Sequence, residues 1–258
     1  MSTQSTNNTT EATSPTGDIK VFIDAFNKDF DTQLKSLLDA QQNYKNVYAD
    51  AIKISTPKKG RWPLGGSTLV DGNTGAVDTS DLGSDPKVVK DAEVLLLPGV
   101  GSFRKAMESL RDLNLDEAII ESTQNQDHKI LGICLGMQLM GSRSSEDGMT
   151  EGLNLIPTPV EEFSKEEVGI RKIPHIGFDQ VSFPPQSRLF KGLPEDSDFY
   201  FVHSFRMLGF DLKGNSAICH YGREFLAAYE EDNIFATQFH PEKSQTNGLM
   251  LLRNFLAA

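Results

Sequence analysis

The stretch "ILGICLGMQLM", residues 130–140, places Cys134 between Gly132 and Gly136, where a short apolar run gives way to a helix-like segment. This Gly-x-Cys-x-Gly order is typical of a sharp strand-to-helix turn that carries a nucleophile, because the glycines avoid clashes with the neighbouring strand and helix. We therefore expect Cys134 to adopt a strained backbone conformation at the carboxyl edge of a sheet.

The expected position of Cys134 has chemical consequences. The first-turn amides of a helix carry partial positive charge, which favours a thiolate over a thiol. The same amides, such as that of Leu135, can bind an oxyanion. The alternative is that Cys134 is a small core residue, as most free cysteines are, and this pattern alone leaves both interpretations open.

The segments around this turn alternate between strand and helix patterns. The stretch "AEVLLLPGVGSF" (92–103) is a strand pattern ending in a glycine-rich turn, "FRKAMESLRDLNLDEAIIES" (103–122) is helical, and "KILGI" (129–133) is a buried strand pattern. Nearer the start of the chain, residues 19–26 form a strand pattern and residues 30–42 an amphipathic helix pattern. The order predicts an α/β fold with a mostly parallel central sheet flanked by helices.

The C-terminal half consists mainly of short strand patterns, which predict an antiparallel extension of the sheet. A helix pattern, "NGLMLLRNFLAA" (247–258), ends the chain. The strand patterns are "HIGFDQVSF" (175–183), "DFYFVHSFRM" (198–207), "AICHYG" (217–222), "FLAAYE" (225–230) and "IFATQFH" (234–240).

The composition fits one globular domain with a polar tail. Of the 258 residues, 38% are hydrophobic and 24% are charged. Residues 1–17 are rich in Ser, Thr and Asn, so we expect a disordered tail, followed by one domain over residues 18–258. Residues 55–86 collect Gly, Pro, Asp and Thr around few apolar side chains, which indicates a surface loop insertion.

Charge and cysteine content limit the partners and the compartment. The formal net charge of −11 gives little support to a nucleic-acid partner, which normally needs a clustered basic surface. No apolar run is long enough to span a membrane, and the first residues lack the pattern of a secretion signal. Two cysteines, Cys134 and Cys219, form no disulfide framework and no zinc pattern. We therefore expect a cytoplasmic protein without a membrane partner.

Nucleophilic catalysis by cysteine needs a base and a group that orients the base. The stretch "QFHPEKS" (238–244) supplies His240 after an expected strand, with Glu242 two residues later. The carboxylate can accept a hydrogen bond from one imidazole nitrogen while the other nitrogen faces the sulfur. Four other histidines compete for this role, and the sequence favours structural roles for them: His128, His175, His203 and His220.

The pairing of "GICLGMQLM" with "QFHPEKS", in this order, resembles the class I (triad) glutamine amidotransferases. The resemblance implies a flavodoxin-like α/β fold and a cysteine that attacks the side-chain amide of L-glutamine and releases ammonia. It also implies that Cys134, His240 and Glu242 are the catalytic residues, with no metal and no organic cofactor.

Further motifs resemble one branch of this family, the glutaminase subunit of imidazole glycerol phosphate synthase. These motifs are "SDPKVVKDAEVLLLPGVGSF", "IPHIGFDQV", "FYFVHSF" and "QFHPEKSQTNGLMLLRNFL", which together cover roughly residues 84 to 258. Other branches usually have an "SPGP"-like turn where this chain has "PGVG" (98–101). The resemblance implies delivery of ammonia to a (β/α)₈-barrel cyclase that forms imidazole glycerol phosphate for histidine biosynthesis.

The resemblance also assigns residues around the substrate. The "PGVG" turn would complete an oxyanion hole with the amide of Leu135, and Gln138 matches a glutamine near the substrate. His203 and Ser204, like His175 and Gly177, would line the site or the partner surface, and packing roles for these four are equally compatible with the sequence. The substrate-binding and oxyanion residues expected on this basis are Gly99, Val100, Gly101, Leu135, Gln138, His203 and Ser204.

Some segments depart from the family pattern. The stretch "DAFNKDFD" (24–31) lacks the glycines of a "YGxGN"-like turn, "GFDQ" (177–180) replaces the more frequent "GWNQ", and the insertion at 55–86 is unusual. These departures leave the glutaminase motifs intact and bear on the identity of the partner. A paralogous subunit that supplies ammonia to a sugar amidotransferase in surface polysaccharide biosynthesis is therefore an alternative. A non-catalytic docking scaffold and a free-standing γ-glutamyl peptidase are two further alternatives, although a scaffold needs none of the three triad residues.

Overall fold

The computed structural model describes residues 54–55, 82–83, 85–209 and 211–258. The expected tail at 1–17, the strand at 19–26, the helix at 30–42 and most of the insertion at 55–86 lie outside these residues. The start of the domain at residue 18 therefore stays a prediction.

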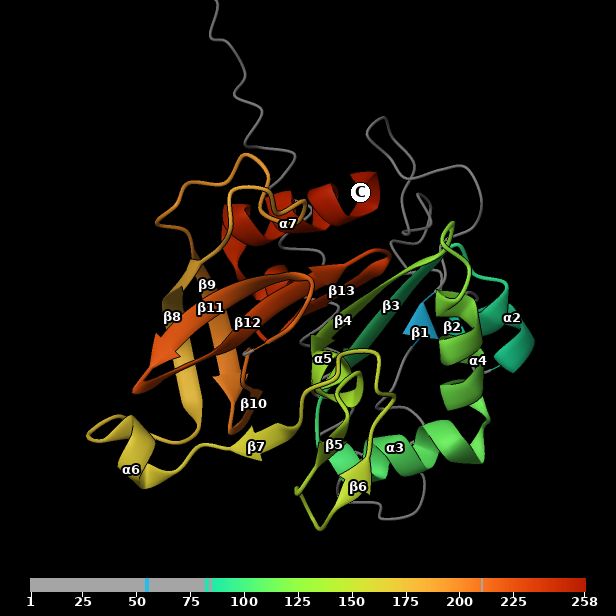
Figure 1. Cartoon of the computed structure of the whole chain (residues 1–258), viewed down its shortest axis with the longest axis horizontal. Coiled ribbons are helices and arrows are strands. Elements are labelled where there is room, and N and C mark those ends of the chain that lie inside the picture. The colour runs from blue at the N-terminus through green and yellow to red at the C-terminus, as the bar shows by residue number, and fades with distance from the viewer. Residues whose placement is uncertain (1–53, 56–81, 84, 210) are drawn as a thin grey trace, which may run out of the picture.

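A mixed sheet forms the centre of the described fold (Figure 1), with the strand order β2-β1-β3-β4-β13-β12-β11-β8-β9. Strands β3, β4 and β13 pair in parallel, and the strands on either side of them pair antiparallel. The strands are β1 (Ile54–Ser55), β2 (Leu82–Gly83), β3 (Val94–Gly99), β4 (Lys129–Cys134), β8 (His175–Ser182), β9 (Asp198–His203), β11 (Asn215–Tyr221), β12 (Arg223–Glu231) and β13 (Ile234–Thr237).

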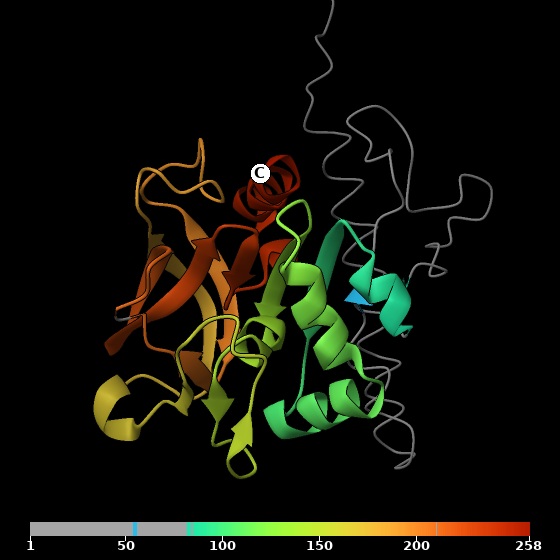
Figure 2. The same cartoon turned by 45° about the vertical axis from the view of Figure 1, so that its right-hand side comes forward.

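Hydrophobic cores lie on both faces of this sheet, because successive side chains of a strand point to opposite faces. Leu95 and Leu97 pack with buried residues of α2 (Pro86–Lys90), α3 (Phe103–Asp112), α4 (Leu115–Thr123) and α5 (Leu135–Leu139). On the other face, Leu131 and Phe235 pack with Leu251 and Phe255 of α7 (Gln245–Ala257). Figure 2 shows α3 and α4 in front of the sheet and α7 behind it.

The α/β class and the antiparallel C-terminal extension are confirmed, and two elements differ in detail from the sequence patterns. The helical stretch at 103–122 is two helices, α3 and α4, because Asn114 takes a left-handed conformation (φ 55°) and begins α4. Asparagine tolerates this conformation better than most residues. The turn lets α4 change direction and run back along the sheet (Figure 1).

The strand pattern at 198–207 also divides, and its two parts belong to different sheets. Strand β9 ends at His203, and β10 (Phe205–Met207) enters a small sheet in the order β10-β7-β5-β6. Its other strands are β5 (Arg143–Ser144), β6 (Thr150–Glu151) and β7 (Val160–Glu162). The loop between β5 and β6 of this small sheet contacts the start of α3, and the helix α6 (Lys165–Val168) follows β7. None of the helices in the described part of the chain could cross a membrane.

Candidate active site

Cys134 lies at the turn from β4 into α5, as expected from the sequence. It has φ 55° and ψ −110°, a strained conformation for a residue with a side chain, and it is the N-cap of α5. Its partner across the parallel pairing is Gly99, the last residue of β3. The turn therefore brings the sulfur to the carboxyl edge of the parallel strands, beside the glycine-rich turn.

The two flanking glycines allow this turn because other backbone lies against them. A Cβ atom on Gly136 would overlap the carbonyl oxygen of Leu97 in β3. A Cβ atom on Gly132 would overlap the sulfur of Met140 and come within 2.9 Å of the Met137 nitrogen. The close approach of α5 to β3 and β4 thus depends on the absence of side chains at both positions.

The expected base and its carboxylate are in contact. His240 follows β13 and begins η1 (Pro241–Lys243), and its Nδ1 lies 2.6 Å from Oε1 of Glu242. The backbone N–H of His240 donates to the carbonyl of Tyr200 at 2.9 Å, which fixes the turn against β9. His240 Nε2 is buried and makes no hydrogen bond with a described residue. The ring is therefore oriented from one nitrogen, and the other nitrogen is available to a reacting group.

The pKa of His240 reflects its surroundings. Burial lowers this pKa, but the electrostatic interaction with Cys134, followed by the hydrogen bond and charge of Glu242, outweighs burial and raises it to about 10. A histidine with so high a pKa is an imidazolium at neutral pH. The imidazolium can donate a proton to a leaving group.

Replacing Glu242 with glutamine is expected to lower the pKa of His240 and to slow amide hydrolysis on the order of 10²-fold, because the ring loses a charged partner and its fixed orientation. The folded pKa of about 10 exceeds the ordinary 6.5, so His240 contributes stability below pH 6.5 that is lost as the pH rises toward 10. In the variant this loss should occur at lower pH. Melting temperatures measured across this pH range test the shift, and an unchanged alkaline limb would contradict it.

Gln138 contacts the cysteine only through a second glutamine. Its Nε2 donates to the carbonyl of Phe205 at 2.9 Å and to Oε1 of Gln238 at 3.0 Å. Gln238 Nε2 in turn lies 3.8 Å from the sulfur of Cys134. No sequence motif assigns a role to Gln238, although it lies two residues before His240 and side chains two apart in an extended strand share a face.

The "PGVG" turn lies next to Cys134, and an acidic loop anchors its far end. Gly101 has φ 111°, a conformation that favours glycine, and apart from its two chain neighbours no described residue has an atom within 4 Å of the position of an added Cβ. Directly after it, the N–H of Phe103 donates to Oε2 of Glu146 at 2.8 Å, and Ser102 Oγ donates to Oδ2 of Asp147 at 2.6 Å. Burial raises the pKa of Glu146. The acidic loop thus holds the start of α3 while leaving space around Gly101.

His203 and Ser204 lie behind the cysteine and belong to the packing of the site. His203 is buried, with Nε2 3.0 Å from Nδ1 of His175 and Nδ1 2.8 Å from the carbonyl of Phe205. The Ser204 carbonyl accepts from the backbone N–H of Phe163 at 3.0 Å. Among the described contacts, neither side chain reaches Cys134 directly.

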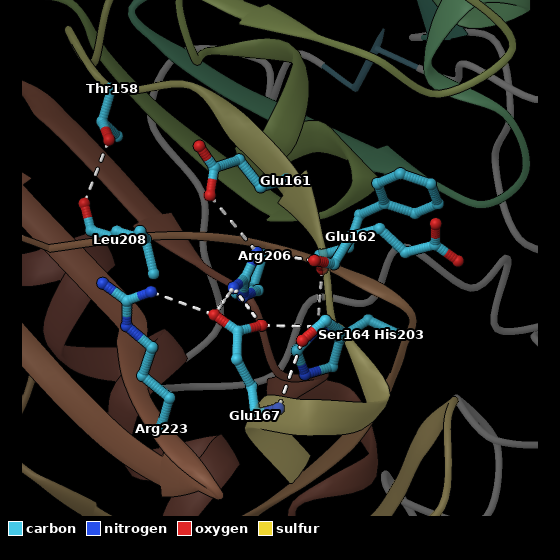
Figure 3. A network of polar contacts seen from close by, with 10 residues as sticks. Thr158, Glu161, Glu162, Ser164, Glu167, His203, Arg206, Leu208 and Arg223 are labelled. Atoms are coloured by element: carbon cyan, nitrogen blue, oxygen red, sulfur yellow. Dashed lines mark hydrogen bonds and ion pairs between the residues drawn. The ribbon is translucent and has the colours of Figure 1, made fainter.

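A buried arginine fixes the strand that follows His203. Figure 3 shows Arg206 between the β7 strand and Glu167 of α6. Its guanidinium donates to both carboxylate oxygens of Glu167 at 2.9 and 2.8 Å and to the carbonyl of Glu162 at 2.9 Å. It also lies over the ring of Phe163, 5.0 Å from the centroid. A buried charge needs such pairing, so these contacts hold β10 and the Phe205 carbonyl in place.

Two other titratable side chains, Cys219 and His128, belong to other parts of the fold. Cys219 is buried in β11, and burial raises the pKa of its thiol to about 12. His128 pairs with Ser122, its Nδ1 3.1 Å from the hydroxyl oxygen. Within the described residues there is no group of three or more His, Cys, Asp or Glu side chains placed to hold a metal ion.

The fold places a cysteine at a strand-to-helix turn together with a histidine and a carboxylate from a distant part of the chain, an arrangement typical of α/β enzymes that use a cysteine nucleophile. The family model "Glutamine amidotransferase class-I" matches residues 67–258. A crystal structure of a glutamine amidotransferase, 15% identical, superposes with a TM-score of 0.51 over 68% of this chain and 83% of that one, which supports the fold alone.

Similarity to curated relatives indicates which branch of this family the chain belongs to. The chain is 47% identical to the imidazole glycerol phosphate synthase subunit HisH 1 of Campylobacter jejuni over 68% of this chain and 86% of that protein. It is 46% identical to the HisH subunit of Helicobacter hepaticus over 67% of this chain and 79% of that protein. The chain therefore belongs to the class I glutamine amidotransferase family and, within it, to the imidazole glycerol phosphate synthase subunit HisH family, which confirms the resemblance seen in the sequence.

Proposed function

We propose that the chain hydrolyses L-glutamine to glutamate and ammonia in the cytoplasm, with Cys134 as nucleophile. As the glutaminase subunit of imidazole glycerol phosphate synthase, it delivers the ammonia to a (β/α)₈-barrel cyclase in histidine biosynthesis. The observation that carries the proposal is the strained turn at Cys134 together with the paired His240 and Glu242, whose free imidazole nitrogen is buried. The names of the HisH relatives support the pathway.

The chemistry follows from these groups. The Cys134 thiolate attacks the side-chain amide carbon of glutamine, and Nε2 of the His240 imidazolium protonates the departing ammonia. The neutral imidazole then removes a proton from water, which attacks the γ-glutamyl thioester and releases glutamate. Glu242 keeps the ring in place through Nδ1 in both steps. These two steps use only groups of the protein, glutamine and water.

The negative charge on the tetrahedral intermediate needs hydrogen-bond donors. We assign this role to the N–H of Leu135, at the start of α5, and to an N–H of the "PGVG" turn, formed by Gly99, Val100 and Gly101. The open space around Gly101 supports a turn that can reorient. One such donor contributes ~10²–10³ in rate. The anchored start of α3 confines any reorientation to the residues before Ser102.

The partner surface that we propose is the exposed face of β8 and β9. Ile176 and Phe178 are 58% and 43% exposed, which is unusual for large apolar side chains in a central sheet. Phe178 packs edge-on against the ring of Tyr200, 5.4 Å between centroids. The Tyr200 carbonyl accepts from the backbone N–H of His240, and the Tyr200 N–H donates to Ser244 Oγ, so a partner on this face contacts the strand that supports the proposed catalytic histidine.

Replacing Phe178 with aspartate is expected to weaken binding of the cyclase at least about tenfold, because a charge is buried against an apolar surface. The control is Ile170→Asp, at a fully exposed position beyond α6. Titration of the purified cyclase into each variant, followed by glutamate release, gives both affinity and activity. Equal binding by the two variants would contradict the assigned surface.

The same assay distinguishes the alternative functions. Release of glutamate that increases with the histidine cyclase supports the proposal. Stimulation only by a sugar amidotransferase from a polysaccharide pathway would assign the chain to the paralogous branch. Folded protein that releases no glutamate with either partner would indicate a docking scaffold, and full activity on γ-glutamyl peptides without a partner would indicate a peptidase.

A further inference from the structure

A row of short polar contacts runs through the buried side of β8 and β9. His175 Nε2 lies 2.7 Å from Oδ2 of Asp179, and His175 Nδ1 lies 3.0 Å from Nε2 of His203. His203 Nδ1 lies 2.8 Å from the carbonyl oxygen of Phe205. Both histidines are buried, whereas the Asp179 side chain is 37% exposed, so the row connects the protein surface to the interior.

The number of protons in this row does not match two neutral imidazoles. The row ends in an acceptor on both sides, the carboxylate of Asp179 and the carbonyl of Phe205, and contains three contacts. Each hydrogen bond needs one proton, whereas two neutral imidazoles carry two. The row is fully hydrogen-bonded only when it holds a third proton. Without that proton, one contact brings two lone pairs together.

The Phe205 carbonyl connects this row to the cysteine. It accepts from His203 on one side and from Gln138 Nε2, at 2.9 Å, on the other. Gln138 holds Oε1 of Gln238, whose Nε2 lies 3.8 Å from the sulfur of Cys134. The contacts are therefore continuous from the exposed edge of Asp179 to the sulfur.

We propose that Asp179 is a positioning residue for the cysteine site, and that it makes the alignment of the Phe205 carbonyl, and through it of Gln138 and Gln238, depend on one bound proton. The proposal extends the glutaminase function proposed above. The effect depends on the aspartate that this chain carries at position 179. A carboxylate can only accept a hydrogen bond from His175, whereas an asparagine at this position could donate its amide N–H to His175. Two neutral histidines would then complete all three hydrogen bonds without an added proton.

The charges around the two rings determine where the third proton resides. Burial lowers the pKa of His203 to about 3, helped by His175, His240 and Arg206. Burial also lowers the pKa of His175, opposed by the hydrogen bond and charge of Asp179 and assisted by Arg171. From β11, the Tyr221 ring stacks on His175 at 3.9 Å, and Cys219, whose pKa is raised to about 12, stays neutral.

The lowered pKa of His175 determines how the row of hydrogen bonds depends on pH. Because the pKa of His175 lies below 6.5, the row gains its third proton at the His175–Asp179 end only as the pH falls below 6.5. Above that pH one contact is lost and the Phe205 carbonyl is held less firmly. In the Asp179→Asn variant the row stays complete across the whole range.

Histidine ring ¹⁵N spectra of the full chain, recorded from about pH 5 to about pH 8, test the proton count directly. In the native chain His175 is expected to titrate below pH 6.5. In Asp179→Asn both His175 and His203 are expected to stay neutral with the proton on Nδ1. Asp112→Asn, an exposed carboxylate of α3, is the control for the lost charge and should titrate like the native chain.

Kinetics provides the second readout. The ratio of kcat for Asp179→Asn to kcat for the native chain should rise as the pH increases through 6.5, by about threefold or more, the effect of one modest hydrogen bond. A ratio that does not change with pH, or an identical His175 titration in both proteins, would overturn the proposal. The spectra need no glutamine turnover, so an inactive protein with the expected spectra would refute the glutaminase function and leave the proton-dependent row intact.

Discussion

Replacing Cys134 with alanine is expected to reduce glutamine hydrolysis by on the order of 10⁴-fold or more, because the sulfur is the group that forms the covalent intermediate. Synthesis by the cyclase from added ammonia should persist, since the cyclase needs only the product of the missing step. The substitution removes only one sulfur atom from a buried turn, so the fold should remain. Glutamate release and ammonia-dependent product formation, measured on the same complex, test both statements.

The control is Cys219→Ala, which removes the other thiol from a buried position in β11. Burial raises the pKa of this thiol to about 12, so it is protonated at neutral pH and cannot act as a nucleophile. The variant should keep its glutaminase activity and lose only a modest amount of stability. Loss of both activities in Cys134→Ala would indicate a structural cysteine, and an inactive Cys219→Ala would contradict the assignment of the nucleophile.

Replacing Gly136 with alanine is expected to lower the free energy of unfolding by about 3 kcal/mol or more, because the new methyl group would overlap the carbonyl of Leu97. That carbonyl belongs to the central strand β3, so it cannot move without disturbing the sheet. Urea unfolding of the purified protein measures the change.

The matched control is Gly192→Ala. Gly192 has φ 77°, but in the part of the chain that the structure describes no residue other than its two neighbours has an atom within 4 Å of an added Cβ, so only backbone strain of about 1–2 kcal/mol is expected. Similar losses in the two variants would mean that conformation, and not the contact between α5 and β3, determines the requirement for glycine at position 136.

Much of the site follows from local sequence. The turn at Cys134 was predicted because glycines at fixed spacing around a nucleophile report directly on backbone geometry. The pair of His240 and Glu242 was predicted because a proline and a short spacing place both side chains on one turn. The buried strands around them were predicted from apolar runs, which depend on short-range pattern alone.

The remaining features depend on contacts that no local pattern records. The break between α3 and α4 depends on one left-handed asparagine, and the division at Ser204 depends on which sheet accepts β10. Gln238 and the Phe205 carbonyl contribute through distance and direction, which become definite only when β13, α5 and β10 pack together. The stretch "GFDQ" marks Asp179 as a departure from the family motif. Its contact with His175 became evident only in the structure.

The central claim is that the sulfur of Cys134 bonds to the side-chain carbon of glutamine. The most direct measurement is to mix the protein with isotopically labelled glutamine, quench in acid within the first turnovers, and map the label by peptide mass spectrometry. We expect a γ-glutamyl adduct on the peptide that contains Cys134, and no adduct in Cys134→Ala. An active protein whose label lies on another residue, or whose Cys134→Ala variant still releases glutamate at the native rate, would contradict it.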